Sequence, residues 1–360
     1  MIAGPLTCAA APPEPAGAAA GTTLRPMTVA VMRDPVDKSY RKMLNGMDLF
    51  EEMHGMAPQA SLRFKLLPRQ PDTRMDGIKL AIDADSLSIP VPVQADGTFT
   101  LERNQKALAE EAVVASNRKA LSVTWRAEIR TPGIAPDVRR LGDLRLECQV
   151  GMEADLVSND RPSRFGAFFF RPETNPAMRK RGYCDARKVG YLFFAERPLF
   201  GITLISGARR ETLAVDNLYA GLSDKEISKA DLPYCDCQVL LDRTYFLPLG
   251  DRSWPDDTLV EFDYMEGTSP AVVAPPQAPI AARNAVRAIA IGSSTRDDVR
   301  AVLGNGTAIS FESGYGAWVY QLPEDQPVKD MPVRKTEFVV LFAPSGTVTK
   351  IRLRVPPVAG

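Results

Sequence analysis

Proline is the residue type that most constrains the fold of this chain, with 30 prolines among 360 residues. The proline ring fixes φ and removes a backbone hydrogen-bond donor, so it interrupts helices and the interior of sheets. Frequent prolines therefore favour short strands joined by loops over a helical bundle. The segments between them agree, because GIKLAIDA and DTLVEFDYM alternate apolar and polar side chains. We expect a β-rich body.

The strand-like segments begin at residue 61 and are separated by glycine and proline, which is typical of β-sandwiches. We predict a helix plus a sandwich in residues 27–155. Residues 156–264 are expected to form a second β-rich domain or the second half of that sandwich. LRLECQVGMEADLV, at 144–157, is among the predicted strands. IPVPVQADGTFTL is similar to one hairpin of prealbumin-like sandwiches, with its turn at Asp96 and Gly97.

One segment before the strands has helical spacing. Apolar side chains recur at that spacing over SYRKMLNGMDLFEEMH, residues 39–54, and Ser39 is placed to cap a helix. A methionine-lined helix face can serve as a promiscuous binding groove, but a packed core helix is the commoner role for this pattern.

Charge and the N-terminus bear on partners and compartment. The 44 basic and 44 acidic side chains cancel at pH 7, so the chain carries no net charge. A net positive charge that would attract nucleic acid or an anionic membrane surface is therefore absent from the sequence. Residues 1–26 begin MIAGPLTCAAAPPEPAG, which is similar to the tail of a secretory signal peptide that lacks its basic and apolar start. We expect an exported protein, periplasmic or associated with the outer membrane, whose true start lies upstream. A disordered cytoplasmic tail is the alternative.

Four cysteines remain when Cys8 in the N-terminal segment is set aside. An even number fits disulfides in an oxidising compartment, and four cysteines allow three pairings. Cys235 and Cys237 are separated by one residue, so on a strand their side chains would point to the same face. That arrangement is unfavourable for a disulfide between the two. We therefore expect them to pair with Cys148 and Cys184, with unpaired buried thiols as the alternative. A zinc site would need further ligands beside CDC, so no metal is predicted.

Residues for catalysis are sparse. A nucleophilic triad needs an imidazole or another base, and the single histidine, His54, ends the predicted helix, where we expect a structural role. The sequence holds no phosphate-binding glycine loop, dinucleotide fingerprint or paired-histidine metal motif. No catalytic residue and no cofactor is assigned. Carboxylate pairs for glycoside chemistry stay open, because their separation is a property of the fold.

A second unit follows a proline-rich linker. Residues 265–284 are expected to be extended and to form neither helix nor strand. Residues 285–357 predict a small α+β domain of two helices and a three-stranded antiparallel sheet. In the second helix, Thr295 is a suitable N-cap and Gly304 can end the helix with positive φ. The apolar contacts of the first helix are expected from Val286, Ile289 and Ile291.

Three motifs of this unit carry a resemblance: IAIGSSTRDDVRAVLG, WVY at 318–320, and FVVLFAPSGTVTKI. In this order they resemble the BamE (SmpA/OmlA) family of outer-membrane assembly lipoproteins. Asn305 stands where the family usually has proline, and the family's lipid-bearing cysteine just before the domain is absent. The resemblance implies a non-catalytic interaction module. Trp318 and Tyr320 are its candidate interaction residues, with a core role as the alternative.

Together these features predict a protein that binds or scaffolds an envelope protein partner without catalysis, in the periplasm or in peripheral association with the outer membrane. The alternative is a periplasmic hydrolase or carbohydrate-active protein whose carboxylates lie in a cleft between β domains. Converging acidic side chains in a deep cleft would favour the hydrolase, and an exposed apolar patch would favour scaffolding.

Overall fold

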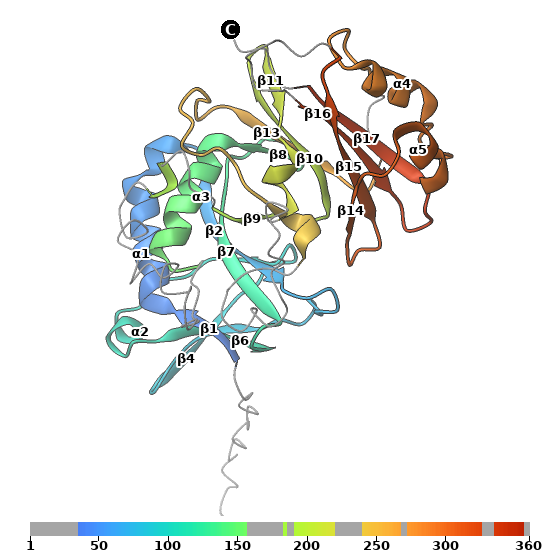
Figure 1. Cartoon of the computed structure of the whole chain (residues 1–360). Coiled ribbons are helices and arrows are strands. Elements are labelled where there is room, and N and C mark those ends of the chain that lie inside the picture. The colour runs from blue at the N-terminus through green and yellow to red at the C-terminus, as the bar shows by residue number, and fades with distance from the viewer. Residues whose placement is uncertain are drawn as a thin grey trace, which may run out of the picture. The chain divides into compact units, whose positions relative to one another are not determined.

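The computed structural model describes residues 35–156, 183–185, 191–219, 240–267, 272–325 and 335–355. These residues contain seventeen strands and five α-helices (Figure 1). The expectation of a β-rich chain with a smaller helical part is therefore confirmed. The signal-like segment, residues 1–26, lies outside the described residues.

The N-terminal region combines strands with three helices. In chain order they are β1 (Pro35–Ser39), α1 (Tyr40–Glu52), β2 (Ser61–Pro68), β3 (Leu80–Ala84), β4 (Leu87–Val91), β5 (Thr98–Phe99), α2 (Gln105–Ala109), β6 (Val113–Lys119), β7 (Val123–Arg130) and, after one strand of another sheet, α3 (Leu141–Glu153). One sheet has the order β1-β6-β3-β4 and the other the order β5-β2-β7. Both share one core with α1 and α3, which includes the fully buried Trp125.

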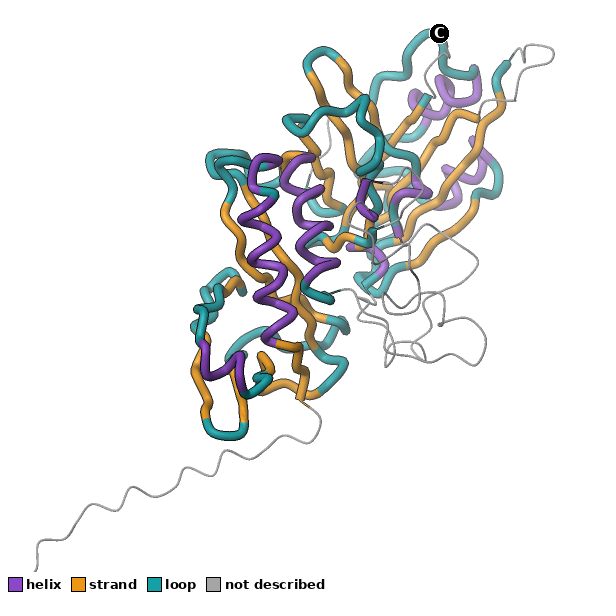
Figure 2. The backbone as a smooth tube through the Cα atoms, turned by 90° about the vertical axis from the view of Figure 1, so that its left-hand side faces the viewer, coloured by secondary structure: helices purple, strands orange, loops and turns teal. Residues whose placement is uncertain are grey.

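The predicted N-terminal helix is confirmed as α1. Its first turn is capped by Ser39, whose side chain accepts the backbone N–H of Lys42 at 3.4 Å. Tyr40, Met43 and Leu44 are buried, so the methionine-bearing face serves as core. This helix packs along α3, and Figure 2 shows the two helices side by side.

The strand predicted at 144–157 is wrong, because Leu141–Glu153 form the helix α3. Apolar and polar side chains alternate in this segment, which is the pattern of a strand. Residues 141–151 are nevertheless all buried, so the helix has no exposed polar stripe by which a helical period could be recognised. Tertiary contacts, rather than the local pattern, decide its structure.

The turn predicted at Asp96 and Gly97 forms, but the hairpin does not. Gly97 has a φ of 79°, and Asp96 Oδ1 accepts the backbone N–H of Thr98 at 2.9 Å. β5 then pairs with β2, while β4 pairs with β3 in the other sheet. The turn therefore passes the chain from one sheet to the next, and the prealbumin-like hairpin is wrong at this point.

A third sheet and a short ribbon form the middle of the chain. The sheet contains β8 (Val138–Arg140), β10 (Leu199–Ser206), β11 (Arg209–Thr212) and β13 (Leu259–Tyr264), and the ribbon contains β9 (Phe193–Phe194) and β12 (Thr244–Tyr245). The sheet order is β11-β10-β13-β8. Because β8 leads directly into α3, this sheet and the N-terminal core are joined through that helix.

The C-terminal unit has both predicted helices and one strand more than predicted. Its elements are α4 (Ile280–Ala288), α5 (Arg296–Leu303), β14 (Thr307–Ser310), β15 (Gly316–Pro323), β16 (Lys335–Phe342) and β17 (Val348–Arg354). They form a sheet of order β14-β15-β16-β17, so the three-stranded expectation is wrong. β14 is a short and mostly exposed edge strand, which lacks the alternation by which strands are recognised.

The predicted ends of α5 agree with the structure, whereas the predicted start of α4 does not. Both ends of α5 are confirmed, because Thr295 forms a capping box with Asp298 and Gly304 ends the helix at a φ of 72°. α4 begins inside the expected linker, since Pro279 precedes it at the N-cap, where proline is tolerated. Ile291, predicted to add an apolar contact, is 45% exposed.

Both faces of the C-terminal sheet are buried. Phe338, Val340 and Phe342 pack with the buried residues of α4 and α5. On the opposite face, Val339 and Leu341 belong to the same core as the third sheet. The side chains of β16 therefore alternate between two faces, and each set packs in a different core.

Charged residues of β17 are buried on that second face. Lys350 Nζ donates to Asp263 Oδ1 at 2.6 Å. Arg352 donates to Glu337 Oε1 at 3.1 Å and to the carbonyl of Phe200 at 2.9 Å. Lys350 and Arg352 therefore attach the C-terminal sheet to β10 and β13.

Candidate functional site

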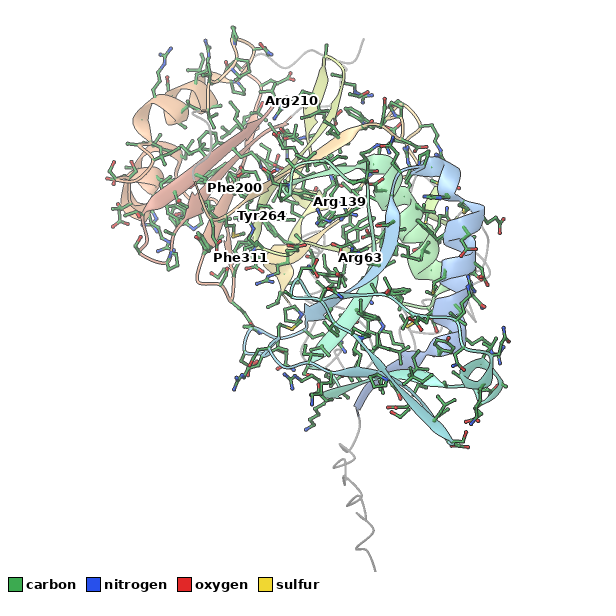
Figure 3. The ribbon with its side chains drawn as sticks, turned by 180° about the vertical axis from the view of Figure 1, so that it is seen from behind. Arg63, Arg139, Phe200, Arg210, Tyr264 and Phe311 are labelled. Carbon is green, nitrogen blue, oxygen red and sulfur yellow. A yellow bond between two sulfur atoms is a disulfide. The ribbon has the colours of Figure 1, made fainter. Side chains whose placement is uncertain are left out.

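A small pocket lies between β7, β8 and α3 on one side and β9, β12 and β13 on the other. We call it the arginine–tyrosine pocket. Its volume is ≈ 40 Å³, which is room for about one to three water-sized groups. Figure 3 labels Arg139 and Tyr264, two of its lining residues. Its charged and aromatic lining consists of Lys65, Arg126, Glu128, Arg130, Arg139, Glu147, Tyr191, Phe193, Phe194, Glu196, Tyr245, Phe262 and Tyr264.

A buried ion pair lies at the inner end of this pocket. Arg139 Nη2 on β8 donates to Glu147 Oε2 on α3 at 2.7 Å and to the carbonyl of Ile129 at 2.7 Å. Both charged side chains are about nine-tenths buried. Burial raises the pKa of the Glu147 carboxyl, and the neighbouring Arg139 acts in the opposite direction. The pair is therefore a fixed contact between the third sheet and the central helix.

A looser cluster of charges lies at the outer end. Glu196 Oε1 is 3.3 Å from Lys65 Nζ and 3.4 Å from Arg130 Nη2, and its side chain is 50% exposed. Arg130 also bonds Glu128 Oε1 at 3.1 Å. Each acidic residue that lines the pocket thus has a basic partner within 4 Å.

Aromatic rings make the third part of the lining. Phe193 stacks on Tyr245 with ring centroids 5.2 Å apart, and Tyr245 meets Phe262 edge-on at 5.3 Å. The Arg126 guanidinium lies over Phe194 at 5.2 Å. Burial raises the pKa of Tyr245 far above its ordinary value. The pocket wall is therefore both cationic and apolar.

The helix α3 positions the inner residues of the pocket. Arg145, one turn before Cys148, is 1% exposed. It donates to the carbonyls of Leu249, Asp251 and Trp254 and to Asp256 Oδ1. These bonds hold the helix against the loop that precedes β13, so Glu147 is presented from a rigid support.

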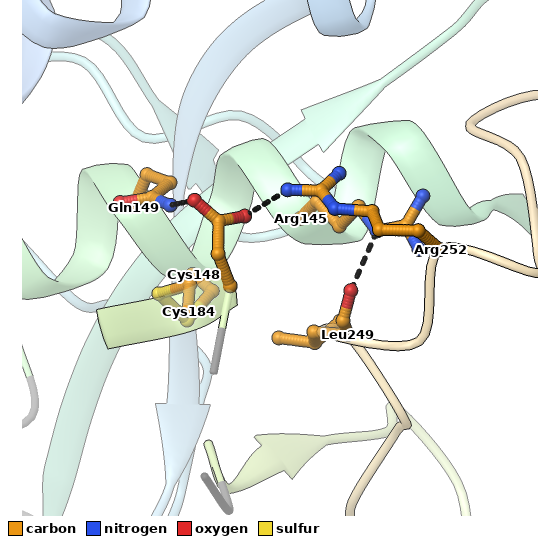
Figure 4. The surroundings of a disulfide bond; sticks show 7 residues. Arg145, Cys148, Gln149, Cys184, Leu249 and Arg252 are labelled. Atoms are coloured by element: carbon orange, nitrogen blue, oxygen red, sulfur yellow. Dashed lines mark hydrogen bonds and ion pairs between the residues drawn. A yellow bond between two sulfur atoms is a disulfide. The ribbon is translucent and has the colours of Figure 1, made fainter. Parts of the chain in front are cut away.

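A disulfide between Cys148 on α3 and Cys184 lies beside this support (Figure 4). The Cα atoms are 6.1 Å apart, and both residues are buried. Asp185 accepts hydrogen bonds from Gln149 at 3.5 Å and from Arg252. The expected pairing of these two cysteines with Cys235 and Cys237 is therefore wrong.

The reason for this error is the fold of the segment. Sequence reasoning placed Cys148 on a strand, whereas it lies on a helix that brings it to residues 183–185. Cys235 and Cys237 lie outside the described residues, so their predicted part in disulfides stays a prediction.

The candidate interaction residues of the C-terminal unit face its helices. Tyr320 is 5% exposed, and its hydroxyl donates to the carbonyl of Gly304 at 3.1 Å. Trp318 is half-buried, edge-on to Phe342 at 4.9 Å, with the Arg300 guanidinium over its ring at 5.3 Å. Tyr320 is thus a core residue, and Trp318 is the more accessible of the two.

The remaining candidates are structural or absent from the described residues. His54 Nε2 lies 2.9 Å from the carbonyl of Ala60, and its ring packs on Phe50 at 4.7 Å, which agrees with the expected structural role. Within the described ranges, no group of three His, Cys, Asp or Glu side chains could hold a metal ion. No described helix is both long and apolar enough to cross a bilayer.

Sequence reasoning missed the charged residues of the pocket. Arg139 and Glu147 are eight positions apart in sequence, and neither belongs to a motif. The available signal was the set of polar residues inside the apolar segment at 144–150, which a core can hold only when each has a partner. Comparisons of the chain with protein-family models, curated proteins and solved structures find no match.

Proposed function

We propose that this protein binds an envelope protein partner without catalysis, in the periplasm or in peripheral association with the outer membrane. In this proposal the N-terminal β-rich region is a sandwich-type body, and residues 285–357 are a BamE-like module that presents its helices to the partner.

The observation that carries the proposal is the exposure of apolar side chains on the helical side of this module. Ile280 on α4, Ile291 between the helices and Val302 on α5 are 53%, 45% and 40% exposed. The opposite face of the sheet is already buried on the third sheet. A contiguous exposed apolar surface is a common feature of protein interaction sites, and in this proposal the three side chains belong to one such surface.

Two further observations support the proposal. The acidic side chains of the arginine–tyrosine pocket all have basic partners, and a volume of ≈ 40 Å³ is too small for a sugar ring. Carboxylate hydrolysis at this place therefore has little support. The buried disulfide of Cys148 and Cys184 supports an oxidising compartment.

Site-specific photo-crosslinking in the native host tests the proposal. A crosslinker at Val302 is expected to capture one defined envelope protein, and the same crosslinker at Leu259 on β13 is the control. Leu259 is matched in exposure, at 38% against 40%. Equal products at both positions, or products only from cytoplasmic proteins, would contradict the proposal.

A further inference from the structure

The entrance of the arginine–tyrosine pocket holds a loosely bound carboxylate. Glu196 Oε1 is shared between Lys65 at 3.3 Å and Arg130 at 3.4 Å, whereas well-formed charge-assisted bonds are about 2.7–2.9 Å long. The half-exposed Glu196 side chain therefore gains little from this contact. A second carboxylate that arrives from solvent can compete for the same two cations.

The inner end of the pocket offers a donor. Arg139 is 7% exposed, and its Nε is buried without a hydrogen-bond acceptor among the described residues. A buried donor of this kind is costly unless an oxygen atom reaches it. Arg139 lines the pocket, so an oxygen that enters the pocket lies beside this guanidinium, which Glu147 holds in place.

A larger groove adjoins the entrance. It has a volume of ≈ 600 Å³ and shares Lys65, Leu67 and Glu196 with the pocket. Residues 68–78 and 93–97 supply much of its wall, including the polar side chains of Gln70, Thr73 and Gln94. The Gln70 amide and the Thr73 hydroxyl already donate to the carbonyls of Leu121 and Ser122, so their oxygen atoms are left to accept N–H groups from the backbone of an extended chain.

The charge of the pocket selects the ligand group. Four basic and three acidic side chains line it, so the lining carries one net positive charge, which suits a monoanion. Its small volume admits a planar carboxylate and little more. We propose that the arginine–tyrosine pocket binds the C-terminal carboxylate of an extended peptide that lies in the groove, and that Glu196 occupies the entrance until the peptide displaces it.

This site is separate from the helical surface of the C-terminal module. Its failure would leave the crosslinking result at Val302 untouched, and failure of the crosslinking would leave peptide binding untouched. The two proposals are therefore tested independently.

Calorimetric titration of the full, oxidised chain tests the ligand class with three probes. These are acetyl-trialanine with a free carboxylate, the same peptide as its C-terminal amide, and acetate. The acid is expected to bind at least about tenfold more tightly than the amide, because charged hydrogen bonds are lost with the carboxylate. Equal binding of acid and amide, or no binding of the acid, would overturn the proposal. Acetate that binds as tightly as the peptide acid would overturn the assignment to a chain terminus.

Glu196→Gln tests the competition at the entrance. Removing the internal carboxylate is expected to tighten binding of the peptide acid roughly two- to fivefold. Glu261→Gln is the matched control. Glu261 is also partly exposed and paired with an arginine, Arg210, and it does not line the pocket, so this substitution removes the same charge outside the site. A tightening by both variants would mean a general charge effect and would contradict the role of Glu196.

Arg130→Gln removes one of the two cations at the entrance and is therefore expected to weaken peptide binding. Arg130 is 37% exposed in its side chain, so the variant is expected to fold and to bind the peptide acid about fivefold more weakly. The NMR signal of the Arg139 Nε–H, assigned with Arg139→Lys, is expected to shift with the acid and not with the amide. An unchanged signal at saturation would remove Arg139 from the site.

Discussion

At the scale of single residues, this protein is defined by polar groups that are buried with partners. Arg139 with Glu147 and Arg352 with Glu337 each join two elements, and every member of these pairs is less than one-tenth exposed. Such pairs add little net stability when compared with apolar residues, but breaking one leaves an uncompensated buried charge. Their value here is positional, because they fix which elements meet.

Glu147→Gln is expected to destabilise the protein by about 3 kcal/mol, the lower end of the cost of breaking a buried pair. Glutamine keeps the shape of the side chain but leaves the Arg139 charge unpaired. Denaturant unfolding measures the change. Glu211→Gln, which breaks the exposed pair with Arg209, is the control and should leave the midpoint almost unchanged. An equally small effect of Glu147→Gln would contradict the account of this pair.

Alkaline pH is expected to unfold the protein through buried tyrosines. Burial raises the pKa of Tyr219 and Tyr245 above the ordinary value, so the native state retains protons that the unfolded chain loses above about pH 10. The unfolded state then binds fewer protons, and stability falls as pH rises past that point. Tyrosinate absorbance should therefore show a late phase that coincides with loss of the native circular dichroism. Complete tyrosine ionisation near pH 10 in a folded protein would contradict this.

At the scale of elements, α3 shows where prediction from the sequence ends. The ends of α5 were readable because a capping box and a terminal glycine are local signals. The helical form of α3 was not readable, because its side chains are satisfied by residues far away in sequence, such as Leu249 and Trp254. The pocket was missed for the same reason, since its lining comes from segments between residues 65 and 264.

Gly142→Ala is expected to destabilise the start of α3. A Cβ at Gly142 would meet the carbonyl oxygen of Met56 at 2.5 Å and that of Asp256 at 3.0 Å, so the helix or the loop must shift. Overpacking of this kind costs about 1–3 kcal/mol. Gly55→Ala is the control, because nothing lies within 4 Å of the added methyl group. Thermal unfolding should separate the two variants, and similar melting temperatures would be evidence against the close approach at Gly142.

At the scale of the whole molecule, the C-terminal unit is attached by charge as much as by apolar contact. The sequence of β16 alternates between two sets of apolar side chains, but nothing in the sequence indicates that the second set, with Val339 and Leu341, packs in the core of the third sheet. Lys350 and Arg352 are charged, and their partners on β10, β13 and β16 explain their burial. A sequence pattern gives the faces of a strand, but it does not show what covers them.

Glu337→Gln is expected to loosen this attachment. Glu337 accepts the backbone N–H of Val215 at 3.0 Å and a bond from Arg352 at 3.1 Å, so the variant leaves the Arg352 charge buried without its partner. Hydrogen exchange should become faster in β16 and β17 while β2 and β7 keep their protection. Uniform acceleration in all four strands would show that the effect is global and would contradict a specific role in attachment.

The central structural claim is that a disulfide inside the core, between Cys148 and Cys184, holds α3 beside its pocket. The most direct test is mass spectrometry of the protein purified from its native host after digestion without reductant. We predict a cross-linked peptide pair that joins Cys148 to Cys184. Removal of this bond is expected to lower the free energy of unfolding by about 4 kcal/mol, because the unfolded chain gains conformational entropy. Recovery of both cysteines as free thiols, or of either one joined to Cys235 or Cys237, would contradict the account.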